Sequence, residues 1–296
     1  MANYTLENSV LSIILNEAGA ELTSIIKIPD NSQYLWNGNP LYWKRHSPIL
    51  FPIVGSLKNQ SYTHEGKTYS MSQHGFARDM DFVLEDKTDN SILFSLSATK
   101  ETKEVYPFSF KLDIGYTLIE NQIEVSFKVI NTDNKTIYFS IGAHPAFLCP
   151  LKEHEEQTDY FIDFDTKNPI HYILVNEQGF ALKQPVKEQK VLNTSEGLLS
   201  ITPNLFDHDA LIIENNQCQT ISLLDAKQNP YVSVKFDAPL FGLWSPAGKK
   251  APFICIEPWY GRCDASDFDG DLKDREWGNV LEVGQVFEAS YTIQIN

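Results

Sequence analysis

The sequence is dominated by apolar residues that recur at every second position. Between residues 108 and 116, five of them alternate with small or polar residues: Phe108, Phe110, Leu112, Ile114 and Tyr116. A second run follows and comprises Ile123, Val125, Phe127 and Val129. A period of two places alternate side chains on opposite faces of a β-strand, so each run can bury one face. The polar residues 120–122 between the runs predict a turn, and the whole segment predicts a long antiparallel hairpin.

The same alternation appears at both ends of the chain. Residues 287–295 are apolar at the odd positions, and residues 11–15 lead through Ala18 and Gly19 into a further apolar run at 22–28. Helical periodicity is confined to two short segments, 99–106 and 271–277. We therefore expect an all-β fold, a large sandwich of two antiparallel β-sheets. No linker, repeat or low-complexity tract divides the chain, so residues 1–296 are expected to form a single domain.

Charge and cysteine content narrow the classes of function. The 296 residues include 39 acidic and 24 basic side chains, a formal charge of −15. Nucleic acid and acidic membrane surfaces repel such a polyanion, so we expect neither as a partner.

The spacing of the cysteines predicts buried reduced thiols rather than disulfides or a structural zinc site. No signal peptide or membrane-spanning apolar run is visible, so a cytoplasmic location is expected. The cysteines are Cys149, Cys218, Cys255 and Cys263.

Three short segments combine histidine or glutamate with aromatic residues, glycine and proline. They are residues 73–78 (Gln-His-Gly-Phe-Ala-Arg), 142–147 (Gly-Ala-His-Pro-Ala-Phe) and 257–262 (Glu-Pro-Trp-Tyr-Gly-Arg). Glu257 follows the apolar run 253–256, which predicts a buried strand. Burying a carboxylate costs free energy unless it has partners, so Glu257 is a stronger candidate for a functional residue than a surface acid. A single histidine beside glycine is more often a structural hydrogen-bonding residue than a catalyst, so neither histidine decides the function when taken alone.

Taken together and in this order, the three segments resemble the galactose mutarotase-like superfamily, the aldose 1-epimerases, and within it the bacterial LacX-type branch. The resemblance covers nearly the whole chain. It implies a large β-sandwich, sometimes called a supersandwich, which agrees with the alternation described above. It also implies an isomerase that interconverts the α and β anomers of a hexose and needs no metal or other cofactor.

The resemblance implies a role for each of five residues. Glu257 matches the general base that removes the proton from the anomeric hydroxyl, and His144 matches the general acid that protonates the ring oxygen. His74 matches a second histidine, which hydrogen-bonds near the ring oxygen. Asp207 and Arg45 match groups that hold sugar hydroxyls. Candidates for stacking on a sugar face are Trp36, Trp244 and Trp259.

Arg78 suggests a sugar phosphate as an alternative substrate. The segment 74–78 looks more like the hexose-6-phosphate branch of the superfamily than the free-galactose branch, and Arg45 resembles that branch's other arginine. Guanidinium groups hold phosphate bidentately, so two of them could bind such a ligand. The competing interpretation is that Arg78 pairs with Asp79 or Asp81 and supports the loop, while Arg45 binds a hydroxyl of a free sugar.

Two other classes of function stay open at this point. A non-catalytic carbohydrate-binding or sugar-sensing protein can share the same fold, because function resides in the site and not in the fold. A β-sandwich hydrolase would require two carboxylates beside the scissile bond, with Asp207 as the partner of Glu257. The presence of both Glu257 and His144 favours catalysis, since binding alone requires neither an acid nor a base. The sequence leaves the identity of the hexose and the oligomeric state open.

Overall fold

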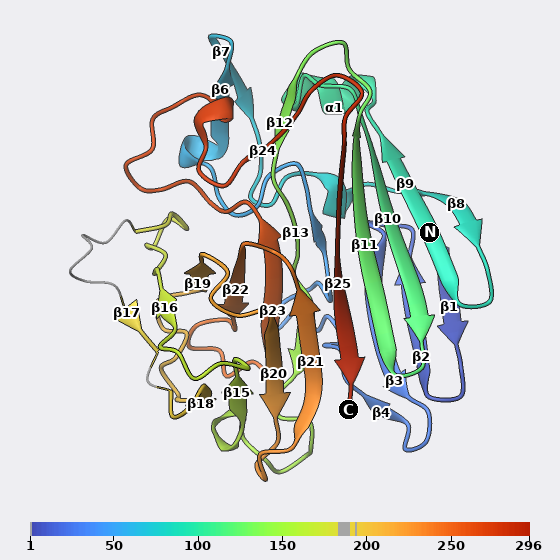
Figure 1. Ribbon diagram of the computed structural model, residues 1–296, viewed down its shortest axis with the longest axis vertical. Coiled ribbons are helices and arrows are strands. Elements are labelled where there is room, and N and C mark those ends of the chain that lie inside the picture. Colours follow the sequence, from blue (N-terminus) through green and yellow to red (C-terminus); the bar gives the residue numbers. More distant parts are fainter. Residues whose placement is uncertain (1, 183–189, 193) are drawn as a thin grey trace.

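The computed structural model describes residues 2–182, 190–192 and 194–296. Antiparallel β-sheets make up most of its regular structure (Figure 1), as the alternation predicts. In the described part of the chain the single α-helix is α1 (Lys100–Val105), which confirms the predicted helix at 99–106. The Thr99 side chain caps it by accepting a hydrogen bond from Thr102 N. The described 3₁₀ turns are η1 (Lys58–Gln60), η2 (Ala77–Asp79), η3 (Gln157–Asp159) and η5 (Leu272–Asp274).

The largest sheet has nine strands, and the predicted hairpin lies at its centre. Strand β10 pairs with β11 across a two-residue turn, with Ile119 opposite Gln122. The C-terminal strand β25 lies between β21 and β11, so the end of the chain completes the middle of the sheet (Figure 1). In spatial order the strands are β18 (Leu198–Ser200), β15 (Phe161–Asp163), β20 (Thr220–Leu224), β21 (Pro230–Phe236), β25 (Val286–Ile295), β11 (Gln122–Asn131), β10 (Phe110–Ile119), β9 (Ser91–Ser97) and β8 (Val83–Lys87).

A six-stranded sheet carries the segments singled out in the sequence. Its strands are β19 (Leu211–Glu214), β22 (Leu240–Trp244), β23 (Phe253–Tyr260), β13 (Ile141–Ala143) and β5 (Ile49–Leu50), with β14 (Ala146–Leu148) also paired to β23. Strands β13 and β14 contact different parts of the same strand, because Gly142 lies opposite Trp259 and Ala146 lies opposite Cys255. The link between β13 and β14 therefore lies beside the middle of β23.

Smaller sheets complete the architecture. The four-stranded sheet is formed by β1 (Asn3–Glu7), β2 (Leu11–Asn16), β3 (Glu21–Lys27) and β4 (Ser32–Gln33), and the β2–β3 pair is the hairpin predicted near the start of the chain. The two-stranded sheets are β6 (Ser61–His64) with β7 (Lys67–Ser70), β12 (Ile137–Phe139) with β24 (Asn279–Leu281), and β16 (His171–Tyr172) with β17 (Lys190–Val191). In the described part of the chain no helix is long and apolar enough to cross a membrane.

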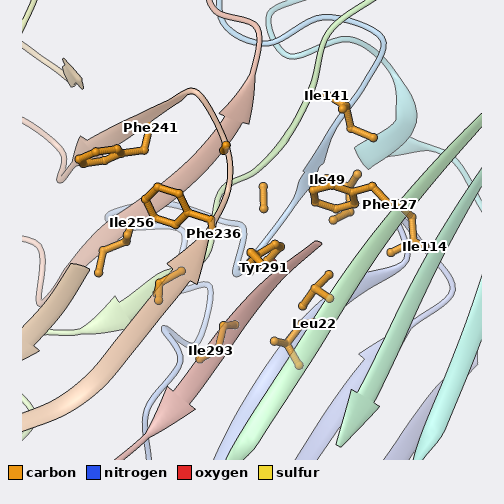
Figure 2. Packing of buried hydrophobic residues seen from close by; sticks show 14 of the residues in the cluster. Leu22, Ile49, Ile114, Phe127, Ile141, Phe236, Phe241, Ile256, Tyr291 and Ile293 are labelled. Carbon is orange, nitrogen blue, oxygen red and sulfur yellow. The ribbon is translucent and has the colours of Figure 1, made fainter. Parts of the chain in front are cut away.

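One hydrophobic core joins the sheets. Figure 2 shows Ile114 and Phe127 of the nine-stranded sheet, Phe241 and Ile256 of the six-stranded sheet and Leu22 of the four-stranded sheet within one cluster. Each of the five side chains is at most 2% exposed. Burial of apolar side chains on this scale is the main favourable term in folding, so the core holds the sheets in fixed relative positions.

Strand β23 presents different residues on its two faces. Ile254 and Ile256 pack into the main core. Phe253 and Cys255 belong to a separate small cluster with Trp36 on the other side of the sheet. Because successive side chains of a strand point to opposite faces, Glu257 lies on the same face as Phe253 and Cys255. The alternation of β23 therefore places a carboxylate on the face of the sheet away from the main core.

The predicted helix at 271–277 is wrong. The chain forms a single 3₁₀ turn there, capped by Asp271, whose side chain accepts a hydrogen bond from Lys273 N. The backbone then becomes extended at Arg275. The Arg275 guanidinium donates hydrogen bonds to Asp264 and to the carbonyl oxygen of Arg262, at 2.8 and 2.7 Å. These long-range bonds need an extended backbone, so tertiary contacts override the local helical pattern.

Candidate active site

Glu257 is a buried carboxyl group in the middle of β23. It lies opposite Gly242 of β22 and is 1% exposed. A Cβ atom at Gly242 would lie 2.5 Å from the Trp259 ring, so glycine is required for that ring to cover β22 beside Glu257. Burial raises the pKa of Glu257 well above its ordinary value, and the charge of Asp209 raises it further, while the Trp259 indole lowers it by less.

His144 lies against Glu257. It is the first residue of the link between β13 and β14, and its backbone N–H donates to Pro48 O. Its Nε2 atom is 3.2 Å from Glu257 Oε2. Trp43 stacks on the imidazole at 4.7 Å and Trp244 contacts it edge-on at 5.4 Å, both measured between ring centroids. The pairing of β13 and β14 with β23 and the two tryptophans therefore hold the imidazole against the carboxyl group.

Burial favours the uncharged forms of both groups. The pKa of His144 is lowered to about 3, first by burial and then by the positive charges of Arg78 and Arg45. The pKa of Glu257 is shifted upward for the corresponding reason. In the described part of the chain, Glu257 Oε2 and His144 Nδ1 have no hydrogen-bond partner. The pair can therefore hold one proton without net charge and has hydrogen-bonding capacity for a ligand.

His74 lies next to His144. The two rings meet edge to face, with 5.6 Å between centroids. His74 adopts the left-handed region at φ 65°, followed by Gly75 at φ 71°. Its Nδ1 accepts a hydrogen bond from Gly55 N at 3.1 Å, so the neutral ring carries its proton on Nε2. Burial, followed by the charge of Arg78, lowers its pKa well below the ordinary value. A neutral His74 can therefore donate from Nε2 but does not act as a cation.

Arg45 and Arg78 converge on one carboxylate. Arg45 Nη2 is 2.7 Å from Asp79 Oδ1, and Arg78 Nε is 3.8 Å from Asp79 Oδ2. Arg78 also donates from Nη2 to Gln73 O at 2.6 Å, and this bond joins it to the segment that carries His74. Burial and the neighbouring Arg45 lower the pKa of Arg78 to about 10. The contact predicted between Arg78 and Asp79 is present, and Arg45 shares the same carboxylate.

Asp207 and Asp209 both lie in an exposed segment that precedes β19. Asp207 is exposed and lines a cavity of about 480 Å³ together with Phe206. Asp209, two residues later, accepts a hydrogen bond from Trp244 Nε1 at 2.6 Å. Its charge acts on Glu257, as described above. Asp209 is therefore close enough to act on Glu257, and the hydroxyl-binding role expected for Asp207 stays a prediction.

Two tryptophans contact His144, and two cavities are lined by residues of neighbouring segments. Trp43 was not predicted from the sequence, whereas Trp244 was. Of the other two predicted tryptophans, Trp36 is buried in the small cluster on the face of β23 that carries Glu257, and Trp259 packs over β22. A cavity of about 610 Å³, lined by Gln73 and Arg78 among others, borders the segment that carries His74. The 480 Å³ cavity includes Ser245 and so adjoins Trp244.

The chain is similar to known proteins over nearly its whole length. The sequence model of the aldose 1-epimerase family matches residues 2–293. The chromosomal protein LacX of Lactococcus lactis subsp. lactis is 33% identical over 297 residues, 98% of each chain. A galactose mutarotase related enzyme from Lactobacillus acidophilus superimposes with a TM-score of 0.93 at 36% identity, covering 100% of this chain and 97% of that one. A galactose mutarotase-like protein from Lactobacillus casei ATCC 334 gives 0.92 at 31% identity, covering 100% of both chains. The chain therefore belongs to the aldose 1-epimerase family.

Proposed function

We propose that the protein is a mutarotase, an aldose 1-epimerase that interconverts the α and β anomers of a hexose. The observation that carries the proposal is the buried pair of His144 Nε2 and Glu257 Oε2, 3.2 Å apart. Opening a cyclic hemiacetal requires one proton to leave the C1 hydroxyl while another reaches the ring oxygen. Two adjacent titratable groups of opposite protonation state can perform both transfers, and a positioned acid or base contributes a factor on the order of 10²–10⁴ in rate.

The proposed reaction begins with the proton of the pair on His144. The Glu257 carboxylate removes the proton of the C1 hydroxyl, the C1–O bond to the ring oxygen breaks, and the ring oxygen takes the proton from His144. Glu257 is then protonated and His144 neutral, which is the uncharged state that burial favours. The open-chain aldehyde rotates about C1–C2 and recloses on its other face with both proton transfers reversed.

Neighbouring side chains position the sugar in this proposal. The Nε2–H of His74 is free to donate near the ring oxygen, because its Nδ1 already accepts from Gly55 N. Asp207 keeps its expected role of binding a sugar hydroxyl, and Asp209, whose charge acts on Glu257, is a second candidate for that role. Trp43 and Trp244, which contact the His144 ring, supply apolar surface for a sugar face.

Polarimetry distinguishes this proposal from binding without catalysis and from hydrolysis. A freshly dissolved pure anomer of glucose or galactose changes its optical rotation as it equilibrates. We expect the protein to accelerate this change without altering the final rotation and without releasing a new product. A protein that binds the sugar but leaves the rate unchanged would be a binding module, and a new product would indicate a hydrolase.

A phosphorylated hexose is the second candidate substrate. Arg45 and Arg78 are both at most 16% exposed at the side chain and share the single carboxylate of Asp79, so the three charges sum to +1. A phosphate could take the place of Asp79 between the two guanidinium groups. If so, kcat/KM should be higher for glucose or galactose 6-phosphate than for the free sugar, and Arg78→Ala should reduce only the former. Equal losses on both substrates would assign Arg78 to loop support.

A further inference from the structure

We propose that His144, Cys255 and Glu257 form a binding site for Zn²⁺ and that zinc occupancy inhibits the enzyme. One ligand atom from each residue can be chosen such that all three lie within 4.8 Å of one another. The three side chains are buried, at 7%, 0% and 1% exposure respectively. The binding of zinc is independent of the proposed function, whereas the inhibition rests on it.

The fold brings the thiol to the acid–base pair for a local reason. Cys255 and Glu257 are two residues apart on β23, so both side chains point to the same face of the sheet. Cys255 lies opposite Ala146 of β14, only two residues after His144. The proposed reaction gives Cys255 no role. Its position beside the pair is therefore a property of the site that catalysis alone does not explain.

The spacing requires only a small adjustment to fit zinc. Zinc bonds of about 2.0 Å to nitrogen and oxygen and about 2.3 Å to sulfur place tetrahedral ligands roughly 3.3–3.6 Å apart. The His144 and Glu257 atoms are already 3.2 Å apart. The three ligand atoms lie within 4.8 Å of one another, so the most distant pair must come closer by about 1 Å or slightly more. Rotation about side-chain torsions can provide this movement.

The chemistry of the ligands favours zinc over harder cations. Thiolate with imidazole and carboxylate is a combination that Zn²⁺ accepts, whereas Mg²⁺ and Ca²⁺ prefer oxygen ligands alone. On binding, the Cys255 thiol loses its proton to solvent, and the proton shared by His144 and Glu257 is also released. Zn²⁺ with one thiolate, one carboxylate and a neutral imidazole carries no net charge, which suits a buried position. A water molecule can fill the fourth position.

Inhibition follows because zinc uses the atoms that transfer protons. With His144 Nε2 and a Glu257 oxygen bound to the metal, neither group can exchange a proton with the sugar. We expect Zn²⁺ to slow mutarotation by wild-type protein and a chelator to restore the rate. Cys255→Ser and Cys255→Ala should retain the rate without zinc but require at least about tenfold more Zn²⁺ for half inhibition, since one of three protein ligands is lost.

Direct binding provides a readout that does not depend on activity. Co²⁺, which substitutes for zinc, gives an intense near-ultraviolet band when bound by thiolate. Titration of wild-type protein should produce this band with one Co²⁺ per chain, and Zn²⁺ should remove it. Both Cys255 variants should lack the band, while Cys218→Ser, a control at another buried cysteine, should keep it. Absence of the band in wild-type protein, or its persistence in both Cys255 variants, would overturn the zinc site. Equal zinc sensitivity of wild-type and variant activity would overturn its role in inhibition.

Discussion

The most informative single residue is Glu257, because its burial conflicts with its charge. At 1% exposure the ionised carboxylate would be costly, and the structure instead favours the protonated form. A glutamate on the surface would be ionised in water and would not need to keep its proton. The neighbouring imidazole, itself held neutral by burial, can accept the displaced proton. A proton that either of two adjacent buried groups can carry is what a concerted acid–base step requires.

Glu257 should make stability decrease as pH rises. The pKa of this carboxyl group is higher in the folded protein than in the unfolded protein. The folded protein therefore keeps a proton that the unfolded chain releases, and its stability falls as the pH rises from the unfolded pKa to the folded pKa. Above about pH 7.5, the unfolded carboxyl group is ionised and His144 is mostly neutral in both the folded and the unfolded state. We expect the stability of Glu257→Gln relative to wild type to grow with rising pH there for as long as the folded carboxyl group keeps its proton, by at most about 1.4 kcal/mol per pH unit.

Urea denaturation of both proteins at several pH values measures this difference. The matched control is Glu124→Gln, which makes the same substitution at an exposed position of β11. Its stability relative to wild type should not show the same slope. A flat difference for Glu257→Gln as well would show that Glu257 is already ionised in the folded protein at neutral pH.

At this scale, the sequence predicted the pair but not all of its neighbours. Glu257 could be selected as a candidate because it follows an apolar run, and the resemblance to the family implied the role of His144. Asp209 was not singled out because the segment 207–209 contains two aspartates, and the sequence alone does not show that the charge of Asp209 acts on Glu257. Trp43 was missed because its loop is held by Glu21, whose side chain accepts hydrogen bonds from the following segment at His46 N. The positions of Asp209 and Trp43 both depend on residues that are distant in the sequence.

At the scale of elements, the alternating strands were the most predictable feature and the connections were the least. The central hairpin and the C-terminal strand have one buried and one polar face, so their period of two is clear. The segment at 271–277 has a helical pattern, yet the long-range bonds of Arg275 keep its backbone extended. The links that carry His74 and His144 have no periodicity, and only the paired strands around them determine where these side chains point.

The turn at His74 and Gly75 gives a prediction about such a link. A Cβ atom at Gly75 would lie 2.3 Å from Phe51 O, and its φ is 71°. Gly66, in the turn between β6 and β7, has a φ of 76° but no atom within 4 Å of its added Cβ. Gly66→Ala should therefore cost only the left-handed conformation, about 1 kcal/mol. Gly75→Ala should cost about 3 kcal/mol or more and should also reduce kcat, because His74 must move.

Denaturant titration gives the two stabilities, and polarimetry gives the two rates. Since both substitutions place alanine in the left-handed region, the difference between them isolates the clash with Phe51. If Gly75→Ala lost no more stability and no more activity than Gly66→Ala, the close approach of the two segments would not be needed to position His74.

At the scale of the whole molecule, we propose that the chain is one folding unit. The main hydrophobic cluster includes Leu6 near the start and Ile295 near the end, and it contains residues of the nine-, six- and four-stranded sheets. Strand β25 pairs with both β11 and β21, so it joins segments from the two halves of the chain. A second unit would need a core of its own with few contacts to the first.

Thermal or denaturant unfolding tests this proposal. The far-ultraviolet circular dichroism of the sheets and the fluorescence of tryptophans near the pair, such as Trp43 and Trp244, should change in one coincident transition. A transition of the fluorescence at clearly lower denaturant than that of the circular dichroism would indicate that the site region unfolds separately from the sheets.

The most direct test of the proposed mechanism is the rate of mutarotation of Glu257→Gln and of His144→Asn. A separate binding measurement should show that each variant still binds the sugar. Polarimetry on a pure hexose anomer should show that each variant loses a factor of about 10² or more in kcat, with a smaller change in KM. Because both groups act in one step, the double variant should be little slower than the slower single variant. Near wild-type rates in a folded, sugar-binding Glu257→Gln variant would contradict the assignment of the acid–base pair.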